Sequence, residues 1–340
     1  MTMMAFGPVP SRRLGRSLGI NNIPPKVCTY SCVYCQLGRT NRMQARRQPF
    51  YEPDAVVEAV RRQVEAARRG KEGIDYLALV PDGEPTLDVN LGASIRALRP
   101  LGIPIAVITN GSLLDHPGVR EDLLDADWVS VKVDAAREGS WREIDRPHGS
   151  LSLTAVLEGV EQFAADFPGH LQTETMLIEG FNDGEGDLRA TAKFVEGLHP
   201  ETAYISVPTR PPAEAWARAP GEFVLARAFG IFSERIPQVE LLSGYEGDAF
   251  ASSGDARRDL LSITAVHPMR ESAVHRTLEA AGSDWDVVAG LVETGELVEV
   301  EFGGHRYYLR PVGAPGRTGP CGRDFSQETT AGQADPETSS

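Results

Sequence analysis

Short apolar segments alternate with longer amphipathic ones over most of residues 17–236, and this alternation constrains the fold more than any other feature of the chain. Strands that alternate with helices predict right-handed crossovers and a parallel sheet. We therefore expect an α/β fold, a partial (β/α)6 TIM-like barrel with its helices outside. The expected strands are residues 17–23, 74–80, 103–110, 128–134, 171–177 and 203–208, and the expected helices are residues 53–68, 90–98, 117–124, 151–165, 184–198 and 213–236.

Two neighbouring strands in this pattern carry polar side chains on one face. Successive side chains alternate across a strand, so in residues 128–134 the valines fall on the face opposite to the polar groups. A parallel strand covered by helices outside can present polar groups only inward, which predicts a substrate chamber. A register error that turns these groups outward is the alternative. The polar sets are Ser130, Lys132 and Asp134 on the first strand, and Gln172, Glu174 and Met176 on the second.

The chain beyond the barrel predicts a second, smaller unit. Three expected helices, residues 255–262, 269–280 and 285–293, precede a segment that alternates around Gly303-Gly304, a two-residue hairpin signal. Three helices and a hairpin are typical of a winged-helix-like domain. We expect residues 1–243 to form the barrel, 244–254 a linker, 255–312 the winged-helix-like domain and 313–340 a disordered tail.

Net charge is unevenly distributed along the chain. The total is -14, yet residues 1–50 contain eight Arg or Lys and no acid, which leaves -22 for the remainder. The basic segment could offset a negatively charged cofactor or hold an anionic substrate, and a solvated basic face is the alternative. Phosphate binding needs Lys and Arg across the docking surface, so the acidic remainder argues against nucleic acid as a partner.

Length and hydropathy place the chain among globular proteins. Its 340 residues are 41% hydrophobic, which suits a packed protein with one large and one small domain. No apolar run approaches the roughly 20 residues that a membrane span needs. Residues 1–10 lack the pattern of an export signal. We therefore expect a cytoplasmic protein without a membrane partner.

Three of the four cysteines lie within eight residues, in the pattern Cys28-x3-Cys32-x2-Cys35. Thiolates are the usual ligands of 4Fe-4S clusters, and three of them leave the fourth iron without a protein ligand. The remaining cysteine, Cys321, lies in the expected tail. A structural zinc site would need a fourth ligand and a partner knuckle, and a disulfide framework would need an export signal, so both alternatives are weaker.

Two turns directly follow predicted strands, at the end where ligands collect in parallel barrels. Residues 74–80 lead into the motif Gly83-Glu84-Pro85, and residues 103–110 end in Thr109-Asn110. Glycine allows close approach of a ligand, and exposed carbonyls or a carboxylate can accept a hydrogen bond from an ammonium group. An ordinary turn is the alternative at each place.

The cysteine motif, with Tyr34 directly before Cys35, resembles the cluster loop of the radical S-adenosylmethionine (SAM) superfamily. The resemblance implies two cofactors, a 4Fe-4S cluster held by Cys28, Cys32 and Cys35 and SAM chelated by the open iron. It implies that an electron from the cluster cleaves SAM to a 5'-deoxyadenosyl radical, which abstracts hydrogen from an unidentified substrate. We expect reduced flavodoxin or ferredoxin as the electron donor.

The resemblance also assigns SAM-binding roles to the turns. The backbone around Gly83-Glu84-Pro85 is expected to receive the methionyl amino group, although Asp82 stands where many relatives have a glycine. Thr109 and Asn110 are expected to shape the SAM site. Further candidates are Tyr34 for the adenine, and Ser130 and Asp134 for the ribose hydroxyls.

A narrower resemblance rests on residues 7–16, on residues 35–40 and on the terminal module. Together they are similar to a little-characterised branch of radical SAM proteins that is grouped with wyosine-type tRNA synthetases. Wyosine synthases use a second cluster on additional cysteines, which this chain lacks, so tRNA guanosine modification stays an alternative. An iron-sulfur regulatory protein that acts through the winged module is another. The module has six Arg or Lys against ten Asp or Glu, which disfavours DNA binding.

Three residues are candidates for catalysis. Lys132 could form a Schiff base or pair with a substrate carboxylate, and a salt bridge to Asp134 or Glu174 is the alternative. Arg146 and His148, like Arg12 and Arg13, are candidates for anchoring an anionic substrate, because an arginine fork suits carboxylate or phosphate. The segment around Arg146 could instead only fix the loop before the following helix.

Overall fold

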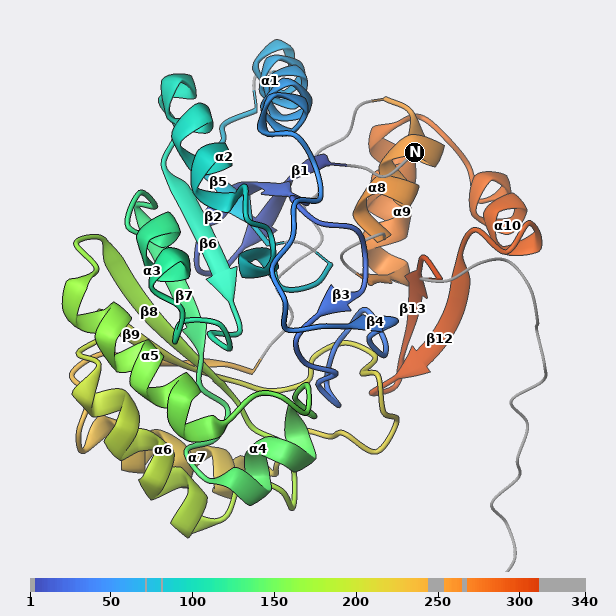
Figure 1. Cartoon of the computed structure of the whole chain (residues 1–340). Helices are drawn as coiled ribbons and strands as arrows, with labels where there is room; N and C mark the ends of the chain where they lie inside the picture. The colour runs from blue at the N-terminus through green and yellow to red at the C-terminus, as the bar shows by residue number, and fades with distance from the viewer. Residues whose placement is uncertain (1–3, 71, 81, 244–253, 265–267, 312–340) are drawn as a thin grey trace, which may run out of the picture.

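The computed structural model describes residues 4–70, 72–80, 82–243, 254–264 and 268–311. An eight-stranded sheet in the order β1-β2-β5-β6-β7-β8-β9-β10 forms its main body (Figure 1). β1 pairs antiparallel with β2, and the other neighbours in this sheet pair in parallel. The strands are β1 (Ala5–Ser11), β2 (Gly15–Ile20), β5 (Tyr76–Leu79), β6 (Ile105–Thr109), β7 (Trp128–Lys132), β8 (His170–Met176), β9 (Thr202–Ser206) and β10 (Val239–Leu242).

All six predicted strands are present, and the expected α/β fold of a partial barrel is confirmed. The sequence did not predict β1 and β10, which are the two edges of the sheet. β1 contains Pro8 and Pro10, which cannot donate hydrogen bonds to a ladder and are tolerated on an edge strand. β10 has four residues and therefore too short a pattern to recognise.

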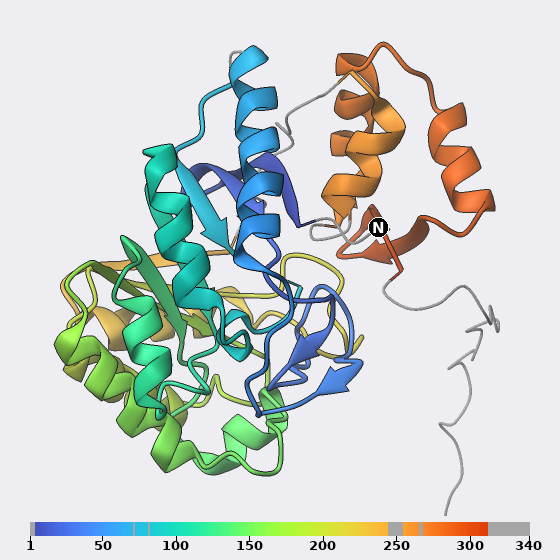
Figure 2. The ribbon, with the colours of Figure 1, turned by 45° about the horizontal axis from the view of Figure 1, so that its top comes forward.

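The helices between the strands pack on the outer face of the sheet (Figures 1 and 2). In the first of them, Val56, Val60 and Val64 recur every four residues and are buried against the sheet. These side chains belong to one large apolar core that runs between the sheet and the helices. The helices are α1 (Pro53–Arg69), α2 (Leu91–Leu98), α3 (Pro117–Leu123), α4 (Glu138–Ile144), α5 (Leu153–Asp166), α6 (Glu185–Gly197) and α7 (Glu222–Ser233).

Two helices differ from the sequence-based expectation. The helix expected over residues 213–236 is wrong at its start, because α7 begins only at Glu222. Pro220 would interrupt a longer helix, since proline removes a backbone donor and clashes with the preceding turn. α4 was not predicted, and its seven residues give too short a pattern to identify from the sequence.

Polar side chains of β7 and β8 point to the inside of the barrel, as predicted. Val129, Val131 and Val133 pack into the core beneath the helices, so the alternate side chains of that strand point the other way. β8 pairs with β7 in register, which places Glu174 directly beside Lys132. The interior therefore carries charge at this level of the sheet.

The carboxyl-terminal region has its own apolar cluster of buried residues. The predicted hairpin is confirmed, because Phe302 pairs with His305 and both intervening glycines have positive φ, 58° at Gly303 and 73° at Gly304. The expected helix over residues 269–280 starts two residues later, since its first two residues pair with the hairpin as a strand. The elements are α8 (Ala256–Thr264), β11 (Met269–Arg270), α9 (Glu271–Ala280), α10 (Asp286–Glu293), β12 (Val298–Phe302) and β13 (His305–Leu309).

This region contacts the barrel through α8, which lies against β1, and through Tyr307, whose hydroxyl donates to the Thr209 carbonyl oxygen at 3.0 Å. Most of the expected linker, residues 244–253, lies outside the described residues, as do the expected tail 313–340 and its Cys321. The domain boundaries therefore stay predictions. Within the described ranges, each helix is too short or too polar to cross a membrane.

Candidate functional site

Cys28, Cys32 and Cys35 lie on one loop after β2, here called the cysteine loop (residues 26–38). Cys28 belongs to β3 (Val27–Cys28), which pairs with β4 (Arg42–Met43) in a separate two-stranded sheet. The Cys35 backbone N–H donates to the Cys32 carbonyl oxygen at 3.2 Å, which bends the chain between these two thiols. The loop thus presents three thiols on one short, hydrogen-bonded segment.

Lys26 places a cation within this loop. Its Nζ lies 3.4 Å from Cys35 Sγ and also donates to the Gly38 carbonyl oxygen. The residue is only 2% exposed, and its φ of 60° is unusual for a residue other than glycine. A positive charge beside the loop would offset the negative charge of a thiolate-ligated cluster.

The donor set fits an iron-sulfur cluster. Burial raises the pKa of the Cys28 thiol to about 12, with a smaller contribution from Glu84, so a thiolate there needs a bound cation such as iron. No group of three or more His, Cys, Asp or Glu in the described part of the chain is arranged to hold a single metal ion. A cluster makes a different demand, because each thiolate binds its own iron.

Gly83 is where the motif after β5 meets the cysteine loop. A Cβ at this position would lie 2.0 Å from the Val27 carbonyl oxygen and 2.9 Å from Ile23 Cδ1. The next residue, Glu84, donates its backbone N–H to the same Val27 oxygen at 3.1 Å. Only glycine allows this close approach, so the motif supports the backbone directly before Cys28.

Both oxygens of the Glu84 carboxylate accept hydrogen bonds from other groups of the protein. Its Oε1 accepts hydrogen bonds from the Thr86 and Thr109 hydroxyls, both at 2.6 Å, and its Oε2 accepts from the Asn110 backbone N–H at 2.8 Å. These bonds join the turn η1 (Pro85–Leu87) to the end of β6. Because the carboxylate is occupied and 1% exposed, the backbone carbonyls are the acceptors that this motif offers to a ligand.

Asn110 links the end of β6 to the cysteine loop. Its Nδ2 donates to Thr29 Oγ1 at 2.7 Å and lies 3.7 Å from Cys28 Sγ. Ser112 donates its hydroxyl to the same Thr29 oxygen at 2.7 Å. The structure therefore brings three sequence-predicted motifs together at the carboxyl ends of three adjacent strands, β2, β5 and β6.

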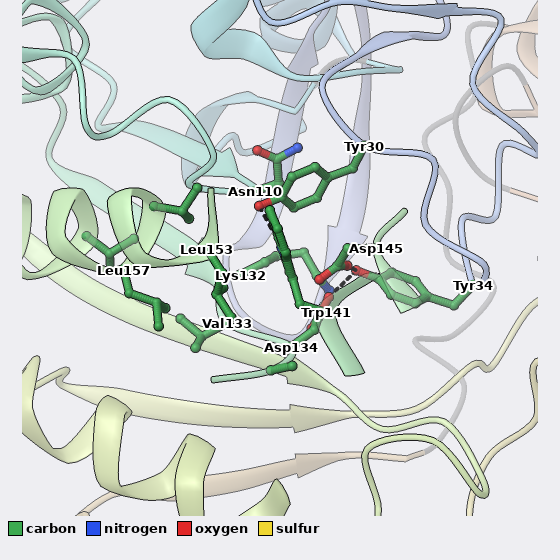
Figure 3. A pocket seen from close by; sticks show the side chains of 13 residues that line it. Tyr30, Tyr34, Asn110, Lys132, Val133, Asp134, Trp141, Asp145, Leu153 and Leu157 are labelled. Atoms are coloured by element: carbon green, nitrogen blue, oxygen red, sulfur yellow. Dashed lines mark hydrogen bonds and ion pairs between the residues drawn. The ribbon is translucent and has the colours of Figure 1, made fainter. Parts of the chain in front are cut away.

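Tyr34 and Asp134 meet across a small cavity of about 20 Å³ (Figure 3). The Tyr34 hydroxyl donates to Asp134 Oδ2, and Asp134 Oδ1 accepts from the Met176 backbone N–H at 2.7 Å. Asp145, which sequence reasoning missed, lies in the same group, and its pKa is raised by burial and by the neighbouring Asp134 carboxylate. Asp145 follows the short α4, so no strand pattern marked it.

Lys132 lies in a buried chain of alternating charges. Its Nζ is 3.2 Å from Glu174 Oε1 and 3.7 Å from Asp134 Oδ1. Burial alone would lower the pKa of Lys132, but these two carboxylates outweigh it and raise the pKa. Arg13 completes the chain by donating to the other oxygen of Glu174. The salt-bridge alternative for Lys132 is thus the arrangement observed.

Arg146 and His148 flank the cysteine loop with their backbone. Arg146 accepts from the Ser31 N–H at 3.3 Å through its carbonyl oxygen, and the His148 N–H donates to the Thr29 carbonyl oxygen at 2.8 Å. The Arg146 guanidinium is paired with Glu214 at 2.5 Å, and His148 Nδ1 accepts from the Ser150 N–H at 3.2 Å. Their catalytic assignment stays a prediction, beside an observed role in fixing the loop.

The remaining predicted residues are more scattered. Ser130 is fully buried and its hydroxyl has no hydrogen-bond partner in the described structure. Pro85 is the first residue of η1 and is buried. Arg12 is exposed. Glu214, which pairs with both Arg39 and Arg146, was missed because it lies in the part of the expected helix 213–236 that is not helical in the structure.

Several known proteins are similar to this chain. A UPF0026 protein of Methanocaldococcus jannaschii is 42% identical over 91% of this chain and 96% of its own length. A protein named GTPase Obg from Brachyspira hyodysenteriae is 34% identical over 64% of this chain, a match that spans 32% of that protein. A solved structure of TYW1 with a bound lysine-pyruvate adduct has a TM-score of 0.49 at 16% identity, covering 65% of this chain and 74% of that one. That likeness is too distant to carry an argument about substrate.

The family model described as the Radical SAM superfamily matches residues 22–195, which include the cysteine loop, both turns and strands β5 to β8. The resemblance carried by the cysteine motif is therefore confirmed. The chain belongs to the radical SAM superfamily, whose enzymes use a 4Fe-4S cluster and S-adenosylmethionine.

Proposed function

We propose that this enzyme holds a 4Fe-4S cluster on Cys28, Cys32 and Cys35 and abstracts hydrogen from a substrate inside the barrel. When bound, the cluster and SAM together supply the reductive cleavage of SAM to a 5'-deoxyadenosyl radical. One observation carries the proposal. The three-cysteine loop, the Gly83-Glu84 turn and Asn110 are hydrogen-bonded to one another at the carboxyl ends of β2, β5 and β6.

The residues around the loop would orient SAM. Carbonyl oxygens at Gly83 and Glu84 would accept from its ammonium group, because the Glu84 carboxylate already accepts its own set of hydrogen bonds. Tyr34 would lie beside the adenine with its ring held by Asp134. Ser130 would offer its unpaired hydroxyl to the ribose once the inner face opens to the ligand.

Lys132 would act as a fixed positive charge. Its raised pKa keeps the ammonium protonated at neutral pH, whereas a Schiff base requires the free amine. It would therefore hold Glu174 and Asp134 in place within the chamber. An electron donor such as reduced flavodoxin or ferredoxin would complete the system.

The test is production of 5'-deoxyadenosine. The full chain is purified without oxygen, reconstituted with iron and sulfide, reduced with dithionite and supplied with SAM, and the nucleoside is measured by mass spectrometry. We expect its formation by the wild-type chain and its loss in Cys28→Ala, Cys32→Ala and Cys35→Ala. The matched control is Cys321→Ala, which removes the fourth cysteine and should keep both the iron and the activity. Iron that stays bound in all three loop variants, or a wild-type chain that leaves SAM intact, would refute the proposal.

A further inference from the structure

A second cavity lies inside the barrel and shares no lining residue with the small cavity beside Tyr34. Its volume is about 190 Å³, and its walls come from β1, β2, β5 and β6 and from the chain directly after Cys35. That volume corresponds to about six molecules of liquid water, which is the size of a small metabolite or of one end of a larger one. Ala78 and Ile108 make part of the wall apolar, so an organic group would fit there.

Asp82 contributes a carboxylate to this cavity. The residue is 4% exposed, and its Oδ1 has no hydrogen-bond partner in the described structure. Its backbone is held on both sides, because its N–H donates to Asn21 Oδ1 at 3.2 Å and its carbonyl oxygen accepts from the Lys26 N–H at 2.7 Å. A buried carboxylate oxygen without a donor is costly, so a donor that arrives with a ligand would account for it.

Two arginines also line the cavity, and each donates a hydrogen bond to a group of the protein. Arg13 donates to Glu174, and Arg210 Nη1 donates to Gln36 Oε1 at 3.0 Å. Arg146, the other predicted anion anchor, is paired with Glu214 away from this cavity. The cavity therefore offers a ligand an acceptor in Asp82, while Arg13 and Arg146, which suggested an anionic substrate, are paired with carboxylates within the protein.

We infer that this cavity binds the part of the substrate that carries an ammonium or another N–H donor, and that Asp82 accepts its hydrogen bond. The inference rests on the proposed function, since it names the chemistry of that enzyme's substrate. Asp82 directly precedes Gly83 and Glu84, so the bound group would lie next to the proposed SAM site. The specificity of Asp82 follows from burial, because a buried acceptor that is left unpaired disfavours a ligand that lacks a hydrogen-bond donor.

Three probes of nearly the same shape test this chemistry: 3-methylbutylamine, 3-methylbutanol and 3-methylbutanoate. Their binding to the full chain, purified without oxygen, is measured by saturation-transfer NMR at physiological salt. We expect the amine to bind roughly tenfold or more tightly than the carboxylate, because a buried acceptor that is left without a donor costs about that much in affinity. Asp82→Asn should lower amine binding by a similar factor, whereas Glu301→Gln, on the exposed hairpin, should leave it unchanged and thereby control for attraction to an acidic surface.

The outcomes separate this inference from the proposed function. Equal binding of the amine and the carboxylate by the wild-type chain would overturn the inference, and this comparison needs no variant. Amine binding that persists in a folded Asp82→Asn chain would overturn it as well, since the site would then lie elsewhere. Failure of the proposed function would appear instead as absent 5'-deoxyadenosine from the wild-type chain, whatever the probes do.

Discussion

Replacement of Glu174 by glutamine tests the buried charge chain inside the barrel. Burial by itself raises the pKa of Glu174, but Arg13 and Lys132 outweigh it and lower the pKa from 4.5 to about 2. A depression of that size corresponds to about 3 kcal/mol of stability, at about 1.4 kcal/mol for each pKa unit. The side chain is 10% exposed, so screening by solvent removes little of this value. We therefore expect Glu174→Gln to lower the free energy of unfolding by about 3 kcal/mol near neutral pH.

Urea unfolding followed by circular dichroism measures the difference. The matched control is Glu185→Gln, because Glu185 also pairs with an arginine, Arg189 at 2.8 Å, but on the exposed surface of α6. That variant should unfold with the wild-type midpoint, since exposed ion pairs contribute little. A Glu174→Gln chain as stable as the control would show that Arg13 and Lys132 do not stabilise the carboxylate.

The same variant has a characteristic pH dependence. A carboxyl group with a depressed pKa in the folded state stabilises the protein fully above its unfolded pKa of 4.5, and this contribution is lost as the pH falls towards about 2. The difference between the wild type and Glu174→Gln should therefore be largest near neutral pH and shrink below 4.5. A difference that does not change with pH would refute the electrostatic explanation and indicate a packing defect.

Three further outcomes test other parts of the site. Gly83→Ala should lower the free energy of unfolding by about 2 kcal/mol or more in urea, because the new Cβ would lie 2.0 Å from the Val27 carbonyl oxygen. The control is Gly139→Ala in α4, where a Cβ would have no other atom within 4 Å, and this variant should be as stable as the wild type or more stable. Burial raises the pKa of Asp82 from 3.8 to about 7, so between these pH values the native chain keeps a proton that the unfolded chain loses. Stability should therefore fall as the pH rises from about 4 to about 7. The melting temperature of Asp82→Asn, measured by thermal unfolding, should lack this decline. Treatment with an iron chelator should abolish 5'-deoxyadenosine formation, and iron with sulfide should restore it, as assayed by mass spectrometry.

The fold was largely predictable because local patterns repeat along the chain. The strand around Val129 and Val131 is bounded by helices of recognisable period, and its polar alternation correctly predicted an inward-facing Lys132. The predictions failed where the chain is irregular or at an edge. β1 carries two prolines and α7 starts only after Pro220, so neither has the pattern of a regular element at the expected place.

The candidate site was predictable only in part. Cys28, Gly83 and Asn110 each belong to a short motif at the end of a strand, and parallel strands bring such ends to the same edge of the sheet. Asp145 and Glu214 have no such motif, because they come from a short helix end and a proline-rich segment. Their places beside Tyr34 and Arg146 depend on long-range packing, which no local pattern encodes.

The sequence alone determined the kind of chemistry. Three thiols within eight residues and the turns at Gly83 and Asn110 are local features, which can be recognised without knowing how the chain folds. Tertiary structure decided which charged side chains are paired within the protein and which buried polar atoms have no partner. Arg13 and Glu174 lie 161 residues apart and neutralise each other, whereas Asp82 Oδ1 is buried without a partner. Ion pairing and desolvation act between groups that only folding brings together, so a count of arginines could not show which of them are paired with carboxylates.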